Sequence, residues 1–338
     1  MNKIARRVVG LRWWPLVALL VLVWLAWQIR QPLLLFFGAV LVAVTLNVLA
    51  LPLRRLGLGQ RSAVLLASLA CVAVVALVVW QLGKPLSEQL QGLRVAVPQA
   101  WQAFHAWLAT TALGPQMVDW WNGFAQNMEL PLAGIAGAAT GLVGAVAGIG
   151  LVLLAGVFLA MDVGMHRNGL VRLVPVRHRT RIEQVLDASG ADLSRWLLGQ
   201  GVLMLVMGLA VAIGLSLLDM PLALGLGLIA GLLEFVPFVG PIVSGLLAVL
   251  VAFAQGPVQA AYVALLFIAL QQIEGALLVP LIQRWTVALP PLLGLGAVLV
   301  FSTLFGPLGV LLGTPLIMVI VVWVRMLYID DMLEARAD

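Results

Sequence analysis

The sequence predicts an all-α polytopic membrane protein with about eight transmembrane segments, including two broken or re-entrant helical hairpins. Of its 338 residues, 63% are hydrophobic and only 10% are charged, whereas about 25% of the residues of a soluble domain are charged. Apolar runs of the length that crosses a hydrocarbon core of about 30 Å recur along the chain. Proline and glycine interrupt two of the C-terminal runs, at residues 237–241 and 306–307. A small extracytoplasmic helical insertion completes the prediction.

Residues 1–82 are predicted to form three transmembrane helices, at residues 15–29, 33–51 and 62–82. A cleaved signal peptide is the alternative for the first, but no small-x-small site follows it and the next apolar run begins at once. Basic residues flank these spans, namely Lys3, Arg6, Arg7, Arg12, Arg54, Arg55 and Arg61. The positive-inside rule therefore places the N-terminus and the connection between the second and third spans in the cytoplasm.

Residues 83–130 are predicted to be an extracytoplasmic amphipathic insertion. They contain more acidic than basic residues, which is consistent with that side of the membrane. Their aromatic residues include Trp101, Phe104, Trp107, Trp120 and Trp121. Tryptophan is enriched at membrane interfaces, so we expect short helices lying along the interface. An aromatic ligand-binding patch is the alternative.

Residues 131–161 are predicted to form a transmembrane helix with a glycine stripe. The glycines are Gly134, Gly137, Gly141, Gly144 and Gly148. Spacings of three and four place them on one helical face, where another helix can approach closely. Tight packing explains the stripe, and a subunit interface or sliding surface is the alternative. The following residues, 162–196, are rich in arginine and are predicted to lie in the cytoplasm.

Residues 197–326 are predicted to form a transport unit with two broken hairpins, followed by a cytoplasmic tail at residues 327–338. The arms of the first break, residues 221–233 and 242–254, have 13 residues each. A helix needs about 20 residues to cross a bilayer. Each break is therefore either a re-entrant hairpin or a pair of short spans, and the arm lengths favour hairpins.

The breaks and the acidic residues near them predict a substrate- or ion-binding site. Its candidate residues are Glu234, Pro237, Gly240, Pro241, Gln271, Gln272, Glu274, Gly306 and Pro307. Carboxylates inside a membrane are costly and usually functional, and two in one cavity can bind a cation or exchange protons. Helix breaks at membrane depth expose backbone groups that meet a ligand. The structural alternatives are that Glu234 caps the second arm and that Glu274 only bonds Gln271.

The sequence argues against several other classes of protein. It contains no His-Glu-x-x-His, Gly-x-Ser-x-Gly or P-loop motif, so neither an enzyme nor an ATP-driven pump is predicted. Cys71 is the single cysteine, and we expect no disulfide, metal site or cofactor. The net charge of +5 is small and lies mainly in the loops, so it indicates topology and not nucleic-acid binding.

Several motifs are similar to those of the AI-2E family of bacterial inner-membrane transporters. They are Gly225-Leu226-Gly227, residues 234–241, Gln272-Ile273-Glu274, Leu278-Val279-Pro280, residues 304–309 and Thr314-Pro315-Leu316, with residues 51–55 and Gly199-Gln200 before them. The resemblance spans nearly the whole chain. Two positions depart from the usual family pattern, with Pro290 where histidine is frequent and Gly275 where asparagine is frequent.

The resemblance implies a secondary transporter that exports a small organic solute similar to autoinducer-2, by an elevator-like movement of the hairpin-bearing unit. It implies a homo-oligomer, with a pentamer as the expected form, and cytoplasmic N- and C-termini in the bacterial inner membrane. A sodium/proton antiporter that uses Glu234 and Glu274 as coupling carboxylates is the first alternative. A membrane scaffold without transport activity is the second.

Overall fold

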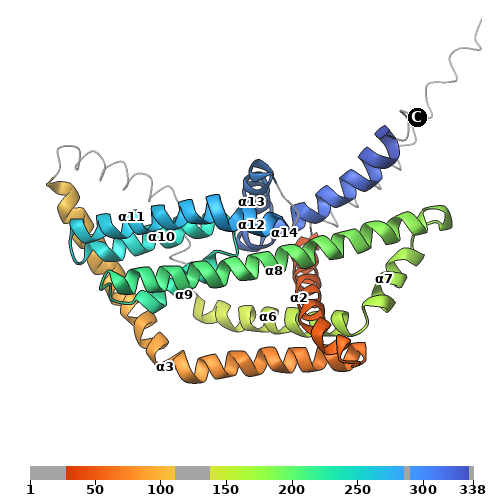
Figure 1. Cartoon of the computed structure of the whole chain (residues 1–338), viewed down its shortest axis with the longest axis horizontal. Coiled ribbons are helices and arrows are strands. Elements are labelled where there is room, and N and C mark those ends of the chain that lie inside the picture. The colour runs from red at the N-terminus through yellow and green to blue at the C-terminus, as the bar shows by residue number, and fades with distance from the viewer. Residues whose placement is uncertain (1–27, 111–137, 285–289, 335–338) are drawn as a thin grey trace, which may run out of the picture.

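The computed structural model describes residues 28–110, 138–284 and 290–334, and every regular element in this part of the chain is a helix (Figure 1). The elements are α2 (Arg30–Arg55), α3 (Gln60–Ala109), α6 (Ala138–Met161), α7 (Val163–Arg172), η1 (Val176–His178), α8 (Arg179–Leu217), α9 (Ala223–Leu233), α10 (Val239–Phe253), α11 (Pro257–Ile273), η2 (Glu274–Leu278), α12 (Val279–Gln283), α13 (Pro291–Phe305), α14 (Pro307–Val324) and η3 (Arg325–Glu334). The first predicted span, residues 15–29, lies almost entirely outside the described residues.

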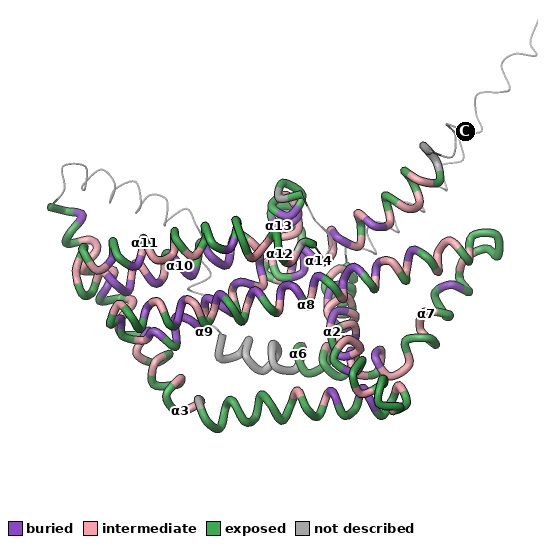
Figure 2. Tube along the Cα trace, viewed as in Figure 1, coloured by how far each residue is buried: buried purple, intermediate pink, exposed green. Residues whose placement is uncertain are grey.

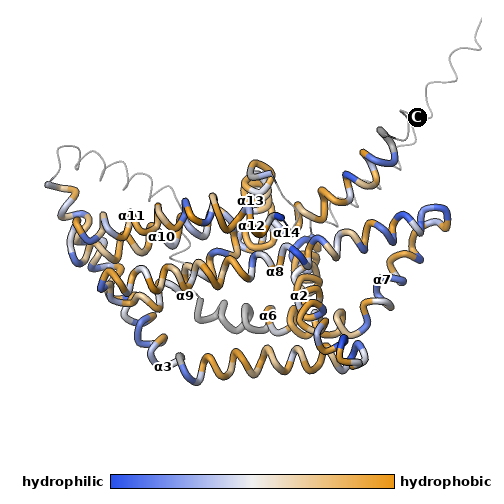
Figure 3. Tube along the Cα trace, in the orientation of Figure 1, coloured by the Kyte–Doolittle hydropathy of each residue, from blue (hydrophilic) through white to orange (hydrophobic). Residues whose placement is uncertain are grey.

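Helix lengths and apolarity confirm a polytopic membrane protein. Five helices within the described residues are long and apolar enough to cross a membrane: Arg30–Arg55, Gln60–Gln81, Val176–Leu217, Pro257–Ile282 and Pro307–Asp331. A sixth candidate is the pair Gly148–Met161 and Val163–Arg172, which is bent by 85°. Hydrophilic residues gather in α7, in the adjacent start of α8 and in the second part of α3 (Figure 3). They therefore lie mainly at the two ends of the bundle, as a bilayer requires.

Helix α8 packs against α9, α11 and α14 and is thus central to the C-terminal half. It is continuous through residues 196–197, where the sequence predicts a boundary between a cytoplasmic segment and a span. Helix α9 packs along it, and Figure 2 shows buried residues on both helices. A Cβ on Gly208 or on Gly231 would lie 3.1 Å from the Cα of the other glycine. Only glycine allows the two backbones to approach so closely.

The predicted glycine stripe falls mostly outside what the structure describes. Gly134 and Gly137 lie outside the described residues, and Gly148 faces open space. Further along α6, Gly156 packs against Val42 of α2. The stripe thus remains a prediction, and the close glycine contact that the structure does describe is between α8 and α9.

Helix α3 differs from its predicted form. It does not end near residue 82 but continues through Pro85 and Pro98 to Ala109. Figure 1 shows it bending, so that its second part, residues 84–109, crosses the ends of the C-terminal helices. We call this part the α3 arm. Its apolar residues Leu93, Ala96, Val97 and Ala100 recur at helical spacing, and Leu93 is buried among residues of α8, α9 and α10.

Two aromatic residues of the α3 arm pack on α10, and their predicted position at the membrane interface remains a prediction. The rings of Phe104 and Trp107 lie 5.0 Å and 5.3 Å from that of Phe253, at the end of α10. Both distances are typical of favourable aromatic pairs. Trp120 and Trp121, which the sequence places in the same insertion, lie outside the described residues.

Candidate functional site

The α9–α10 hairpin places its tip, residues 234–238, deep in the bundle. Its arms of 11 and 15 residues extend about 16 and 22 Å at 1.5 Å per residue, less than a bilayer core. Both feet of the hairpin, Pro221–Leu224 and Gln255, line one pocket of about 520 Å³. The hairpin therefore starts and ends at the same end of the bundle, and its short arms remain the argument for a re-entrant hairpin over a pair of short spans.

Two carboxyl groups meet at this tip. Glu234 is 3% exposed and Glu274, at the end of α11, is 8% exposed. Their side chains interact directly with each other, and Gln271 Nε2 donates to Glu274 Oε2 at 2.8 Å. Two buried carboxylates side by side repel each other when both are charged. The pair is therefore suited to hold a proton, or a small cation in its place.

The structure also distinguishes the alternatives for the two glutamates. The N-cap residue of α10 is Phe238, which makes no side-chain cap hydrogen bond. The partner that the described part of the chain gives to the Glu234 side chain is Glu274. The predicted bond between Gln271 and Glu274 is present, in addition to the carboxyl pair.

Helix α8 holds the tip from the other side. Gln200 is 5% exposed, and its Nε2 donates to the backbone carbonyl of Glu234 at 2.5 Å. One turn earlier, Trp196 packs edge-on against Phe235, with ring centroids 5.7 Å apart. These contacts fix both the backbone and a side chain of the tip. Gln200 is not among the candidate site residues that the sequence predicts, because a donor aimed at a backbone carbonyl leaves no periodic signal.

The backbone of the tip is tightly folded. Phe238 has φ 66°, a conformation that a bulky residue adopts only under constraint. A Cβ on Gly240 would collide with the carbonyl of Leu233, so the two arms can meet only with glycine there. Pro241 is buried and Pro237 is partly buried. The three predicted residues Pro237, Gly240 and Pro241 thus shape the turn.

Glu274 begins a π-helical turn, Glu274–Leu278, that the sequence analysis does not predict. Turns of this kind are rare and frequent at functional sites. Pro280 follows it, and a proline inside a helix clashes with the carbonyl four residues earlier, here Ala276. The wider turn accommodates that clash. Pro280 is therefore the residue in the sequence that could have indicated the π-helical turn.

The remaining predicted residues lie apart from the carboxyl pair. Gln272 is exposed. Gly306 and Pro307 form the joint between α13 and α14, where Gly306 has φ 64°. Near this joint, Phe305 and Leu308 pack with an apolar cluster of α2 and α8 that includes Leu193. A link between the two broken segments does exist at the opposite end of α13, where Phe238 lies against Gly294.

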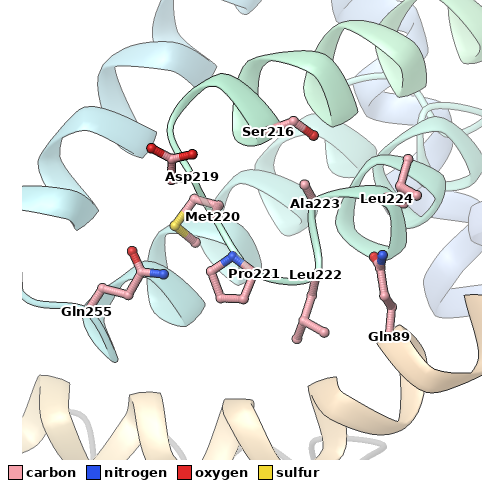
Figure 4. Close-up of a pocket in the computed structure, with 9 residues that line it drawn as sticks. All are labelled: Gln89, Ser216, Asp219, Met220, Pro221, Leu222, Ala223, Leu224 and Gln255. Atoms are coloured by element: carbon pink, nitrogen blue, oxygen red, sulfur yellow. The ribbon is translucent and has the colours of Figure 1, made fainter. Parts of the chain in front are cut away.

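The feet of the hairpin are attached to the α3 arm. Gln89 Oε1 accepts a hydrogen bond from the Gly225 backbone N–H, in the first turn of α9, at 2.7 Å. Such amides have no partner within their own helix, so Gln89 acts as a cap from another helix. Figure 4 shows Gln89 across the pocket from Asp219 and Gln255. This pocket is a polar opening at the base of the hairpin.

A membrane bundle with a short helical hairpin and a buried carboxyl pair is typical of membrane transporters. Residues 16–329 match the model of the AI-2E family transporters, and the chain belongs to that family. This is a family of transporters and not of enzymes.

Curated relatives carry matching names. The chain is 22% identical over 315 residues to the "Putative transport protein YueF" of Bacillus subtilis, covering 86% of this chain and 85% of that protein. It is 32% identical over 147 residues to the "Putative transport protein MT0215" of Mycobacterium tuberculosis, covering 43% and 40%. It is 27% identical over 193 residues to the "Putative transport protein YhhT" of Escherichia coli, covering 55% and 53%.

Proposed function

We propose that the protein is a cation-coupled secondary transporter in which Glu234 and Glu274 are the coupling pair. The observation that supports this most directly is the direct contact between these two buried carboxyl groups. Intramembrane carboxylates mark ion pathways and proton relays. Proton release would leave two adjacent negative charges, and a small cation would neutralise them. Proton and cation binding therefore exclude each other at the pair.

The hairpin suits a transport cycle because its tip joins three elements. It bonds α8 through Gln200 and α11 through Glu274, and it touches α13 through Phe238. A change in the charge of the pair would alter the balance among these contacts. We propose that this change drives an elevator-like movement of the hairpin-bearing unit, and that a bacterial inner-membrane homo-oligomer, expected to be a pentamer, performs it.

Export of a small organic solute similar to autoinducer-2 is the proposal that the family resemblance supports. Simple cation/proton exchange is the alternative that the carboxyl pair supports without any organic solute. A scaffold without transport activity would leave the buried pair without a role.

The test is ion flux into proteoliposomes under imposed proton and sodium gradients. The wild type is compared with Glu234→Gln and Glu274→Gln, which keep side-chain shape and hydrogen-bonding capacity but not the charge. Glu183→Gln, an exposed carboxylate near Arg167, is the control. We expect wild-type and control flux, and background flux in both pair variants. Undiminished flux in the pair variants would refute the role of the pair, and no wild-type flux would refute ion coupling.

A further inference from the structure

A second cavity lies away from the carboxyl pair and has no role in the proposed transport cycle. It has a volume of about 1550 Å³ and is bounded by α2, α7, α8 and α14, with the ends of α3 and α6. The bend of 85° between α6 and α7 opens this space, because α7 turns away from the bundle. The cavity therefore lies at the arginine-rich end of the membrane helices.

The inner wall of the cavity is apolar. Phe36, Phe37 and Val40 of α2 line it together with Leu193 of α8. The serines on the α8 wall, Ser189 and Ser194, donate their hydroxyls to carbonyls of their own helix. These groups need no polar ligand, so the wall is suited to a hydrocarbon chain.

Two polar side chains between the apolar wall and the arginines, Asn47 and Gln60, have partners within the protein. Gln60 Nε2 donates to Asn47 Oδ1 at 2.5 Å and to the Ala160 carbonyl at 2.8 Å. Asn47 Nδ2 donates to the Ala43 carbonyl at 2.8 Å. These two side chains require no further polar partner, whereas the buried Nε1 of Trp323, also in the lining, has none among the described residues.

The mouth of the cavity is basic and has one unpaired cation. Arg61 pairs with Asp162 at 2.9 Å, and Arg167 pairs with Asp187 at 2.7 Å. Arg54, in the last turn of α2, makes no ion pair with any residue that the structure describes. Both aspartates of the mouth are thus already neutralised, and a positive charge remains for a ligand.

The distance between the two zones matches one lipid leaflet. Val40, the apolar lining residue of α2 nearest to the mouth among the three, is 14 positions from Arg54, which corresponds to about 21 Å at 1.5 Å per residue. One leaflet with its headgroup layer is about 20–22 Å thick. A molecule with a hydrocarbon chain and an anionic head therefore fits the length and the charge of the cavity. Basic pockets between membrane helices are known to take anionic lipid headgroups.

We propose that this cavity is a binding site for one anionic glycerophospholipid, with its phosphate at Arg54 and an acyl chain along Phe36, Phe37 and Val40. Arginine matches phosphate because its planar guanidinium donates two parallel hydrogen bonds. A bound lipid would also add to the contacts among α2, α8 and α14, which already pack together around Leu34, Leu193 and Leu312.

The test is lipid retention by the full-length protein, purified in detergent and analysed by native mass spectrometry. The probes are dioleoyl phosphatidylglycerol and dioleoyl phosphatidylcholine, which share their acyl chains and differ in headgroup charge. We expect one phosphatidylglycerol per chain at detergent concentrations that remove phosphatidylcholine. Equal retention of both lipids, or of neither, would overturn the proposal.

Two variants test the site itself. Gly190→Leu fills the cavity, and the structure has only open space beside Gly190, so the variant is expected to fold. We expect it to lose the lipid, and we expect Arg54→Ala to lower phosphatidylglycerol retention at least fivefold. The matched controls are Gly150→Leu, also beside open space, and Arg55→Ala, which is outside the cavity lining. Retention that is unaffected by Gly190→Leu and Arg54→Ala would show annular lipid, or a cavity occupied by another segment or a second copy, and would overturn the proposal.

Discussion

The two broken segments look alike in sequence and differ in structure. The α9–α10 tip contains a buried carboxylate and is bonded by α8 and α11. The α13–α14 joint contains Gly306 and Pro307, and apolar residues pack around it. Its second arm, α14, belongs to a full-length span, whereas both arms of the first hairpin are short. A glycine–proline break therefore shows where a helix bends, and the partners of the bend decide whether it forms a site.

The largest expected effect on transport is at Gly240, where the two arms of the first hairpin meet. Gly240→Leu forces a side chain into the Leu233 carbonyl, and overpacking of this kind costs about 1–3 kcal/mol or more. We expect cation flux to fall to background, measured per folded protein after size-exclusion chromatography. Gly296→Leu in α13, beside open space, is the control. Flux that survives Gly240→Leu would mean that the tip geometry is not required.

Two glutamine variants distinguish the role of the hairpin tip from that of the region near its feet. Gln200→Leu and Gln259→Leu each leave one backbone carbonyl, of Glu234 or of Leu218, without its side-chain donor. An unsatisfied buried carbonyl costs about 1–3 kcal/mol, so both variants should lower the thermal midpoint. Only Gln200→Leu should reduce proteoliposome flux. The reduction is about tenfold if the variant loses about 1.4 kcal/mol of the free energy that holds the tip in position. Equal loss of flux in both would indicate general destabilisation and no positioning role.

The second break should respond in stability more than in transport. Gly306→Ala places a Cβ at φ 64° and ψ −143°, a region that costs a non-glycine residue about 1–3 kcal/mol. We expect a lower thermal midpoint and unchanged flux per folded protein. A loss of flux comparable to that of Glu274→Gln would place the α13–α14 joint in the transport site, as the sequence analysis predicts for Gly306 and Pro307.

The smallest effect is expected at the base of the first hairpin. Gln89→Leu removes the hydrogen bond to the Gly225 amide, worth about 0.5–1.5 kcal/mol. Amide hydrogen exchange around Gly225 should become faster, while Gln91→Leu, an exposed neighbour on the same helix, should leave it unchanged. No difference between these two variants would show that the cap does not stabilise the foot.

The sequence predicts the carboxyl pair well because charge inside apolar segments is rare. Glu234 and Glu274 stand out against long runs without charge, and the structure joins them. Gln200 is harder to predict because its partner is a backbone carbonyl. Every residue has one, so no residue type in the sequence marks the partner. The π-helical turn at Glu274 depends on Pro280 and on the packing around it, and a helical periodicity of 3.6 does not reveal it.

The prediction fails to place the α3 arm for a different physical reason. Gly83 and Pro85 follow an apolar run, and this pattern is typical of a helix end. Here the helix continues because the stripe from Leu93 to Ala100 has a partner in α9 and α10. Tertiary contact thus outweighs the local preference to stop, and such contact cannot be read from one segment alone.

The α3 arm also changes what a displacement of the hairpin would involve. The feet of the hairpin are attached to it through Gln89 and Phe253, while the first part of α3 is anchored to α2 and α6 around Ala63 and Val64. A hairpin that shifts by more than the length of a hydrogen bond must either break the first set of contacts or take residues 84–109 with it. One continuous helix then belongs to both the stationary and the travelling body, and residues 83–85 become the joint between them. The angle at that joint would differ between the two ends of a transport cycle, so a pair of probes placed on either side of it would follow the cycle without touching the site.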